Sequence, residues 1–172
     1  TELQLKIVRN QMDPHFTMNA INAVVDAVNR EEKEQAREHL LHFSKMYRSL
    51  VLSADRIKRT LKEELDFAEN YLALEKFRFG DRFSYRNTID DGVDLTRDVP
   101  KMAIQSPVEN AVKHGFAPLP LSGAERGPGG EAFPLLPGVE GDLILIHAFM
   151  DGPSLVIEVS DNGIGRAAAG TS

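Results

Sequence analysis

A helix-type segment and a glycine-rich turn in the second half of the chain constrain the fold most. Residues 105–115 place four polar groups within about one and a half helical turns: Glu109, Asn110, Lys113 and His114. Asp161-Asn162-Gly163-Ile164-Gly165 follows a strand-like run over residues 155–160. A carboxamide that can hold a metal ion, together with an acid that can accept from the exocyclic amine of a base, indicates a nucleotide site.

The bulk composition limits the classes of protein to consider. With 172 residues, 42% hydrophobic and 27% charged, the chain fits a globular protein of one ordinary domain or two small ones. A net charge of −6 argues against a nucleic-acid partner, because phosphate backbones need a basic stripe. The absence of cysteine excludes a disulfide scaffold.

The first 58 residues predict two amphipathic helices. Pro14 stands inside the first apolar pattern, so we expect a kink there that releases the carbonyl of Asn10. Residues 31–34 are acidic and open the second helix, whose expected apolar stripe is Ala36, Leu40, Phe43, Tyr47 and Leu50. With only a short polar joint between them, the two helices are expected to form an antiparallel hairpin. Such a hairpin cannot cover its own apolar faces. Pairing into a homodimeric four-helix bundle is therefore expected.

A third helix is marked at both of its ends. Thr60 with Glu63 forms a capping-box pattern, and apolar residues recur from there to about Phe79. Gly80 with Asp81 predicts the stop. We expect this helix to connect the hairpin to the second half of the chain.

Strands and a broken segment follow the third helix. The strands are predicted over residues 83–89, 143–149 and 155–160, the last two joined by a hairpin turn at Asp151-Gly152-Pro153. Pro100 stands where a first-turn proline would start the helix through His114. Residues 117–141 are rich in glycine and proline, which predicts a flexible insertion.

A third motif lies near the start of the chain. Gln11-Met12-Asp13-Pro14-His15-Phe16-Thr17-Met18-Asn19 resembles the Asn-Pro-His-Phe-x-x-Asn signature of LytS-like sensor histidine kinases. Residues 105–115 and 161–165 likewise resemble the N box and first glycine box of the GHKL ATPase superfamily, which includes gyrase, MutL and the histidine kinases. Glu64, Leu65, Tyr71 and Leu72 are similar to the connecting helix of the LytS-like family.

The chemistry of the histidine motif fits a phosphoacceptor. Imidazole with a pKa of about 6.5 is largely neutral at pH 7, so a ring nitrogen of His15 is available as a nucleophile toward a γ-phosphate. Asp13 can accept the other ring N–H and stabilise the developing positive charge. Asp13 stands where the family usually has asparagine, and Thr17 and Met18 stand where it usually has a bulkier pair, which leaves the identity of the orienting group open. His39, His42 and His147 are expected to be structural.

The resemblance assigns the nucleotide site residue by residue. It implies ATP and Mg²⁺ as cofactors, with Asn110 as the metal ligand, Glu109 as a polarising carboxylate and Asp161 as the acceptor for the adenine amine. Gly163 and Gly165 would let the backbone pass close to the base. His114 and Lys113 would contact phosphate oxygens, although for Lys113 a solvated surface charge is an equal alternative.

The predicted fold is α+β: an N-terminal antiparallel helical hairpin, dimerised as a four-helix bundle, and a truncated α/β sandwich of the Bergerat type. The predicted domains are residues 1–58 for dimerisation and phosphotransfer, 59–80 as connecting helix and 81–172 as a partial ATPase domain. The family has an ATP lid and a second glycine box beyond the first, and this chain ends at Ser172. We expect this chain by itself to bind nucleotide weakly or not at all.

The resemblance implies a sensor kinase that phosphorylates His15 and passes the phosphoryl group to an aspartate on a response-regulator receiver domain. It also implies that this chain is the cytoplasmic portion of a bacterial inner-membrane protein. Two alternatives stay open: a catalytically silent dimerisation scaffold, and an ATP-driven clamp of the gyrase or MutL kind. The sequence does not decide whether phosphorylation occurs within one protomer or between two.

Overall fold

The fold of the chain is α+β. A computed structural model describes residues 14–115 and 141–162, and the insertion predicted at 117–141 lies almost entirely outside them. The chain forms two compact units. The first comprises residues 1–80 and 94–105, and the second comprises residues 81–93 and 106–172.

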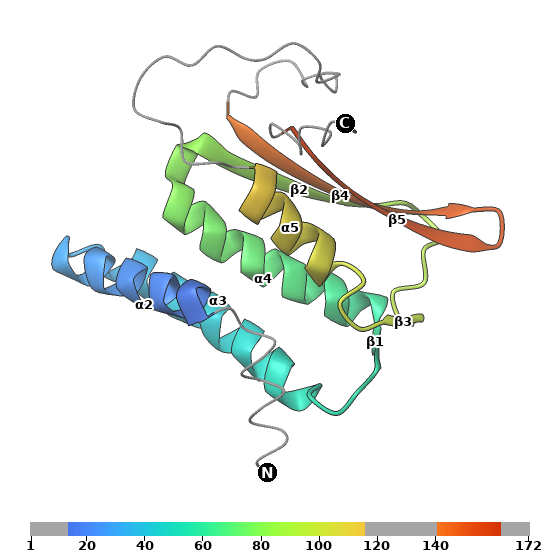
Figure 1. Ribbon diagram of the computed structural model, residues 1–172, viewed down its shortest axis with the longest axis horizontal. Coiled ribbons are helices and arrows are strands. Elements are labelled where there is room, and N and C mark those ends of the chain that lie inside the picture. The colour runs from blue at the N-terminus through green and yellow to red at the C-terminus, as the bar shows by residue number, and fades with distance from the viewer. Residues whose placement is uncertain (1–13, 116–140, 163–172) are drawn as a thin grey trace, which may run out of the picture. The chain divides into compact units, whose positions relative to one another are not determined.

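Within the residues that the structure describes, the first unit is built mainly from three helices. They are α2 (Pro14–Asn29), α3 (Lys33–Leu52) and α4 (Leu61–Phe79), which pack against one another (Figure 1). Pro14 is the first residue of α2. A proline is favourable there, because a first-turn residue needs no N–H partner within the helix. The predicted kink and the carbonyl of Asn10 lie outside the described residues.

The expected boundaries of α4 are confirmed. The backbone N–H of Glu63 donates to Oγ1 of Thr60 over 3.2 Å, and the N–H of Thr60 donates to Oε2 of Glu63 over 2.8 Å. Gly80 ends the helix with φ of 65°, a value that favours glycine. The helix is buried over much of its surface through Leu61, Leu65, Phe67, Ala68, Tyr71, Leu72 and Leu74.

The apolar stripe predicted for α3 is wrong in part. Ala36 and Leu50 are buried as expected, whereas Leu40 is 52% and Tyr47 45% exposed. His39 and Met46 are buried instead. The reason is that α3 is apolar on more than one face, and only one of these faces meets α2 and α4 within the single chain.

The helix start predicted at Pro100 is also wrong. Pro100 ends the short strand β3 (Asp98–Pro100), which pairs antiparallel with β1 (Lys58–Thr60). Helix α5 (Gln105–Gly115) begins only after Met102, whose φ of 69° is incompatible with a right-handed helix. Pro100 therefore lies at the end of a strand and not in the first turn of a helix.

The second unit contains a three-stranded sheet that follows a short 3₁₀ turn, η1 (Gly80–Arg82). Its strands are β2 (Phe83–Ile89), β4 (Asp142–Asp151) and β5 (Ser154–Asp161), in the order β2-β4-β5 (Figure 1). β4 runs parallel to β2 and antiparallel to β5. As the central strand, β4 buries most of its apolar residues, which confirms the strand and hairpin predictions for this region.

Candidate functional site

The predicted phosphoacceptor lies in the first turn of α2. His15 is the second residue of this helix, directly after Pro14. The following residue, Phe16, stacks on Tyr71 of α4, with ring centroids 5.0 Å apart and an interplanar angle of 26°. This contact holds the start of α2 on α4. The side chain of His15 and the whole of Asp13 lie outside the described residues.

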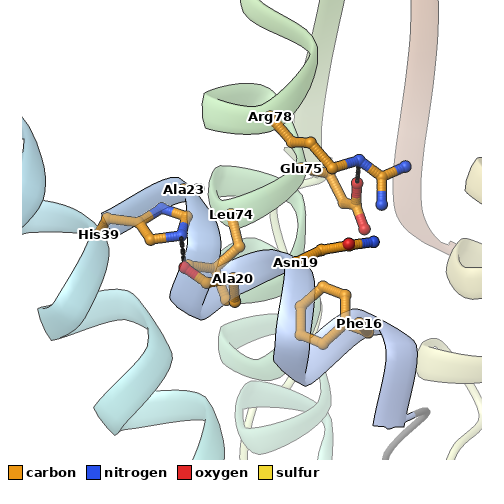
Figure 2. A pocket seen from close by; sticks show the side chains of 8 residues that line it. All are labelled: Phe16, Asn19, Ala20, Ala23, His39, Leu74, Glu75 and Arg78. Carbon is orange, nitrogen blue, oxygen red and sulfur yellow. Dashed lines mark hydrogen bonds and ion pairs between the residues drawn. The ribbon is translucent and has the colours of Figure 1, made fainter. Parts of the chain in front are cut away.

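A small pocket opens next to this turn (Figure 2). Its lining residues come from all three helices: Phe16, Asn19, Ala20, Ala23, His39, Leu74, Glu75 and Arg78. Nε of Arg78 lies 3.2 Å from Oε2 of Glu75, whose side chain is only 2% exposed. Asn19 reaches the same pocket, and it follows His15 by four residues, about one helical turn. A charged pair and a carboxamide are therefore held close to the histidine motif.

His39 joins α3 to α2 on the other side of the pocket. Its Nε2 lies 3.1 Å from the carbonyl oxygen of Ala20, which can only accept, so Nε2 carries the proton. The ring also packs on Phe77, with centroids 4.4 Å apart. Burial lowers the pKa of His39, and the bond to Ala20 opposes this only in part. His39 is thus a neutral, structural histidine.

Helix α5 carries most of the predicted nucleotide-binding groups. Val108, Ala111 and Val112 form the buried side of the helix. Asn110 and Lys113 are exposed, and Glu109 is partly buried. An exposed carboxamide one turn from an ammonium suits phosphate oxygens and a cation that keeps several water ligands, so these residues fit Mg·ATP. The side chain of His114 lies outside the described residues.

The predicted adenine acceptor, Asp161, is the last residue of β5 and is partly buried. It stands opposite Ile144 in the register of β4 and β5. Asn162 follows directly, and its carboxamide accepts from the N–H of Leu143 in β4 and donates to the carbonyl of Gly141, just before β4. Gly163 and Gly165, the remaining predicted positions, lie outside the described residues.

The candidate residues are divided between the two units. His15 belongs to the first unit, whereas Asn110 and Asp161 belong to the second. A phosphoryl transfer from nucleotide to histidine would require the two sets of residues to meet.

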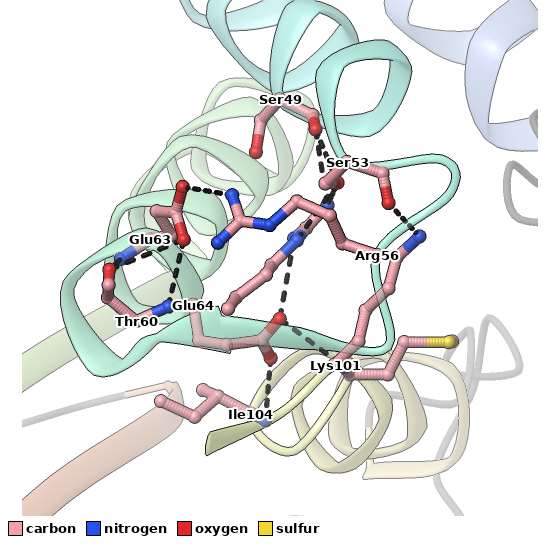
Figure 3. A network of polar contacts seen from close by, with 10 residues as sticks. Ser49, Ser53, Arg56, Thr60, Glu63, Glu64, Lys101 and Ile104 are labelled. Carbon is pink, nitrogen blue, oxygen red and sulfur yellow. Dashed lines mark hydrogen bonds and ion pairs between the residues drawn. The ribbon is translucent and has the colours of Figure 1, made fainter. Parts of the chain in front are cut away.

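A buried ion pair that sequence reasoning did not assign joins the end of α3 to the segment before α5 (Figure 3). Nη1 of Arg59 lies 3.3 Å from Oε1 of Glu64, and both side chains are fully buried. Arg59 also donates to the carbonyl oxygen of Ser49 over 3.2 Å, and to the hydroxyl of Ser53. Burial lowers the pKa of Arg59, and the Glu64 carboxylate opposes this change.

The two carboxylate oxygens of Glu64 accept hydrogen bonds from the backbone ahead of α5. Oε1 accepts from the N–H of Met102 and Oε2 from the N–H of Ile104, each over 3.1 Å. These bonds hold Met102 in its left-handed conformation and satisfy donors at the helix start, where a negative charge is favourable. Glu64 belongs to the pattern that resembles the connecting helix, so that pattern was the available signal for its importance.

None of the helices in the described part of the chain combines the length and apolar character that a bilayer crossing needs.

Comparison with known proteins identifies the class. Residues 3–83 match the family described as histidine kinase. The sensor protein LytS of Staphylococcus saprophyticus is 37% identical over 164 residues, which cover 95% of this chain and 24% of that protein. The LytS of Enterococcus faecalis is 36% identical over 115 residues, 67% of this chain and 19% of its own length. The sensor histidine kinase YpdA of Escherichia coli is 32% identical over 115 residues, 67% of this chain and 20% of that protein.

These relationships place the chain among the histidine kinases. Within that class it belongs to the LytS-like sensor histidine kinases, the family whose motifs it resembles. The chain spans about a quarter or less of the length of the relatives it matches.

Proposed function

We propose that this chain is the transmitter region of a two-component sensor kinase that autophosphorylates on His15 from Mg·ATP. The observation that carries the proposal is the match of residues 3–83 to the histidine kinase family, which includes the motif around His15 at the start of α2. The phosphoryl group would then pass to an aspartate on a response-regulator receiver domain.

The proposed reaction uses the neutral imidazole of His15. Its ring nitrogen attacks the γ-phosphorus of ATP, the bond to the β-phosphate oxygen breaks, and ADP leaves. Asp13 accepts the N–H of the other ring nitrogen and stabilises the positive charge that develops. The stack of Phe16 on Tyr71 supports the proposed role of His15, because it anchors the helix turn that carries this nucleophile.

The proposed nucleotide site combines α5 with the end of β5. Asn110 would hold Mg²⁺ through its carboxamide oxygen, while Glu109 polarises the site and Lys113 and His114 contact phosphate oxygens. Asp161 would accept from the adenine amine, with Gly163 and Gly165 next to the base. The exposure of Asn110 and Lys113 on one side of α5 supports this assignment. Bound Mg²⁺ would neutralise charge on the phosphates during transfer.

We further propose that the protein acts as a homodimer through α2 and α3. Large apolar side chains on the two helices are between 45% and 71% exposed in the single chain: Met18, Ile21, Val25, Val28, Leu40, Leu41, Tyr47, Val51 and Leu52. Two amphipathic helices with uncovered apolar faces favour a four-helix bundle made with a second copy. We also propose that the whole protein is anchored in the bacterial inner membrane by segments other than these helices, with this region in the cytoplasm.

The test uses the full-length protein with radiolabelled ATP and Mg²⁺. We expect an acid-labile label, typical of a phosphoramidate, that is lost in His15→Gln and retained in the control His42→Gln. Label that survives His15→Gln contradicts the proposal. A wild-type protein that takes no label supports the scaffold alternative. Steady phosphate release without a phosphoprotein supports the clamp.

A further inference from the structure

The carboxamide of Asn162 replaces a backbone rung at the end of the β4–β5 ladder. The backbone N–H of Asn162 donates to the carbonyl of Leu143 over 3.2 Å, as it would in a continuing strand pair. The returning bond is different, because the N–H of Leu143 donates to Oδ1 of the Asn162 side chain over 2.7 Å. With that donor taken by a side chain, the ladder cannot continue, and β5 ends directly after Asp161.

The other half of the same carboxamide holds the corner at which the chain enters β4. Nδ2 of Asn162 donates to the carbonyl of Gly141 over 2.9 Å. Gly141 has a φ of 117°, and a Cβ placed there would lie 2.4 Å from the carbonyl oxygen of Arg82. Only glycine fits this close approach. One side chain therefore joins the end of β5 to a corner that packs on the start of β2.

We propose that Asn162 is a positioning residue for nucleotide recognition: it fixes the strand end that carries Asp161, and thereby the direction in which the Asp161 carboxylate meets the base. This inference rests on the proposed function, in which Asp161 accepts from the adenine amine. An acceptor at a frayed strand end would lose orientational freedom on binding, whereas a strand end tied at two atoms has already lost it. Asn162 acts through Asp161 and makes no contact of its own with the base.

The chemistry of the two bonds distinguishes asparagine from its closest substitutes. An aspartate at 162 can still accept from Leu143, but it places a carboxylate oxygen against the carbonyl of Gly141, where a donor is needed. An alanine removes both bonds. We therefore expect both Asn162→Asp and Asn162→Ala to weaken ATP binding and the preference for ATP over GTP. The alanine variant should have the larger effect.

The experiment measures the dissociation constants of ATP and GTP for the full-length protein, together with the autophosphorylation rate at saturating ATP. For Asn162→Ala we expect the ATP dissociation constant to rise about tenfold, the size expected for one lost hydrogen bond to a charged group, and the preference for ATP over GTP to fall by a similar factor. The rate at saturating ATP should change less than about twofold, because the phosphate contacts are not altered. The control is His147→Ala, which removes a 2.8 Å contact with Asp90 in the same sheet.

The outcomes separate this inference from the proposed function. If Asp161→Ala abolishes the preference for ATP while both Asn162 variants bind like the wild type, the inference is overturned and the proposed function stands. An equal loss of preference in His147→Ala also overturns it, because Asn162 would then only stabilise the sheet. If the wild type binds no ATP, or Asp161→Ala leaves ATP binding unchanged, the proposed role of Asp161 fails and the inference fails with it.

Discussion

Two arginine–glutamate pairs near the start of α4 contain the same chemical groups in different environments. Arg59 and Glu64 are fully buried and 3.3 Å apart. Arg56 and Glu63 are 44% and 40% exposed and only 2.8 Å apart. The exposed pair has the shorter contact, yet water screens it and its partners lose little when separated. The buried pair has no such screening, so removing one partner leaves a charge in the interior.

The comparison extends to the other polar contacts of the helical unit. Two of the interior groups contact residues that are distant in the sequence: Glu64 accepts from Met102 and Ile104, and His39 donates to Ala20. Surface contacts are local, as for Lys62 with Asp66. The interior polar groups therefore determine how the helices and the segment before α5 are arranged, whereas the surface groups mainly support single helices.

Loss of the buried guanidinium is expected to have the largest effect. Arg59→Met leaves the Glu64 carboxylate in the interior without its charged partner, which should lower the free energy of unfolding by about 3–5 kcal/mol. Urea denaturation measures this change. The double variant Arg59→Met/Glu64→Gln removes both charges and keeps one of the two acceptor oxygens that face the N–H groups of Met102 and Ile104, so it should recover part of the loss. A wild-type unfolding midpoint for Arg59→Met would show that the pair does not stabilise the unit.

The next effect is a pH dependence that comes from His39. Burial lowers its pKa in the folded state, and the neighbouring His42 lowers it further, so below pH 6.5 the unfolded chain binds a proton more readily than the folded chain. The contribution of His39 to the free energy of unfolding should be fully present above about pH 6.5. Below that pH the free energy of unfolding should fall, by at most about 1.4 kcal/mol per pH unit for one group. Unfolding midpoints at pH 7.5 and 5.5 test this.

The variant His39→Gln is the matched comparison for that experiment. Glutamine can still donate to the carbonyl of Ala20 but does not titrate. Its midpoint should therefore change less between the two pH values than the wild-type midpoint does. An identical change in both proteins would assign the pH dependence to other groups.

A smaller effect is expected from the helix cap. Thr60→Ala removes the oxygen that accepts from the N–H of Glu63, and loss of such an N-cap typically costs about 1 kcal/mol. Thermal unfolding of Thr60→Ala next to Thr60→Ser checks this, because serine keeps the accepting oxygen. Equal losses in both variants would contradict the capping explanation.

The smallest effect is expected for the exposed pair. Arg56→Met removes the partner of Glu63, and hydrogen bonding to Arg56 lowers the pKa of this carboxyl, yet solvent replaces the lost contact. The unfolding midpoint should stay within error of the wild type. A loss comparable to that of Arg59→Met would remove the distinction between the two pairs.

The features that depend on local chemistry were predictable from the sequence. The start of α4 follows from the pattern of Thr60 and Glu63, and its end follows from Gly80. The three strands of the sheet were also expected, because alternation and turn residues are local signals. The α+β class and the LytS-like family followed from motifs of the same local kind.

The features that depend on distant partners were not predictable. Arg59 lies in a charged stretch that indicates an exposed segment, and only Ser49, Ser53 and Glu64 make its burial possible. Pro100 was assigned to a helix start, because its pairing with Lys58 in β1 has no local signal. For α3, the sequence shows that several faces are apolar but not which of them the single chain covers.

The central claim is that His15 accepts the phosphoryl group. The most direct measurement is tandem mass spectrometry, under non-acidic conditions, of the full-length protein after incubation with ATP and Mg²⁺. We expect phosphate on the peptide that contains His15, localised to the imidazole. Phosphate found only on another residue, or none on a protein that binds ATP, would contradict the account.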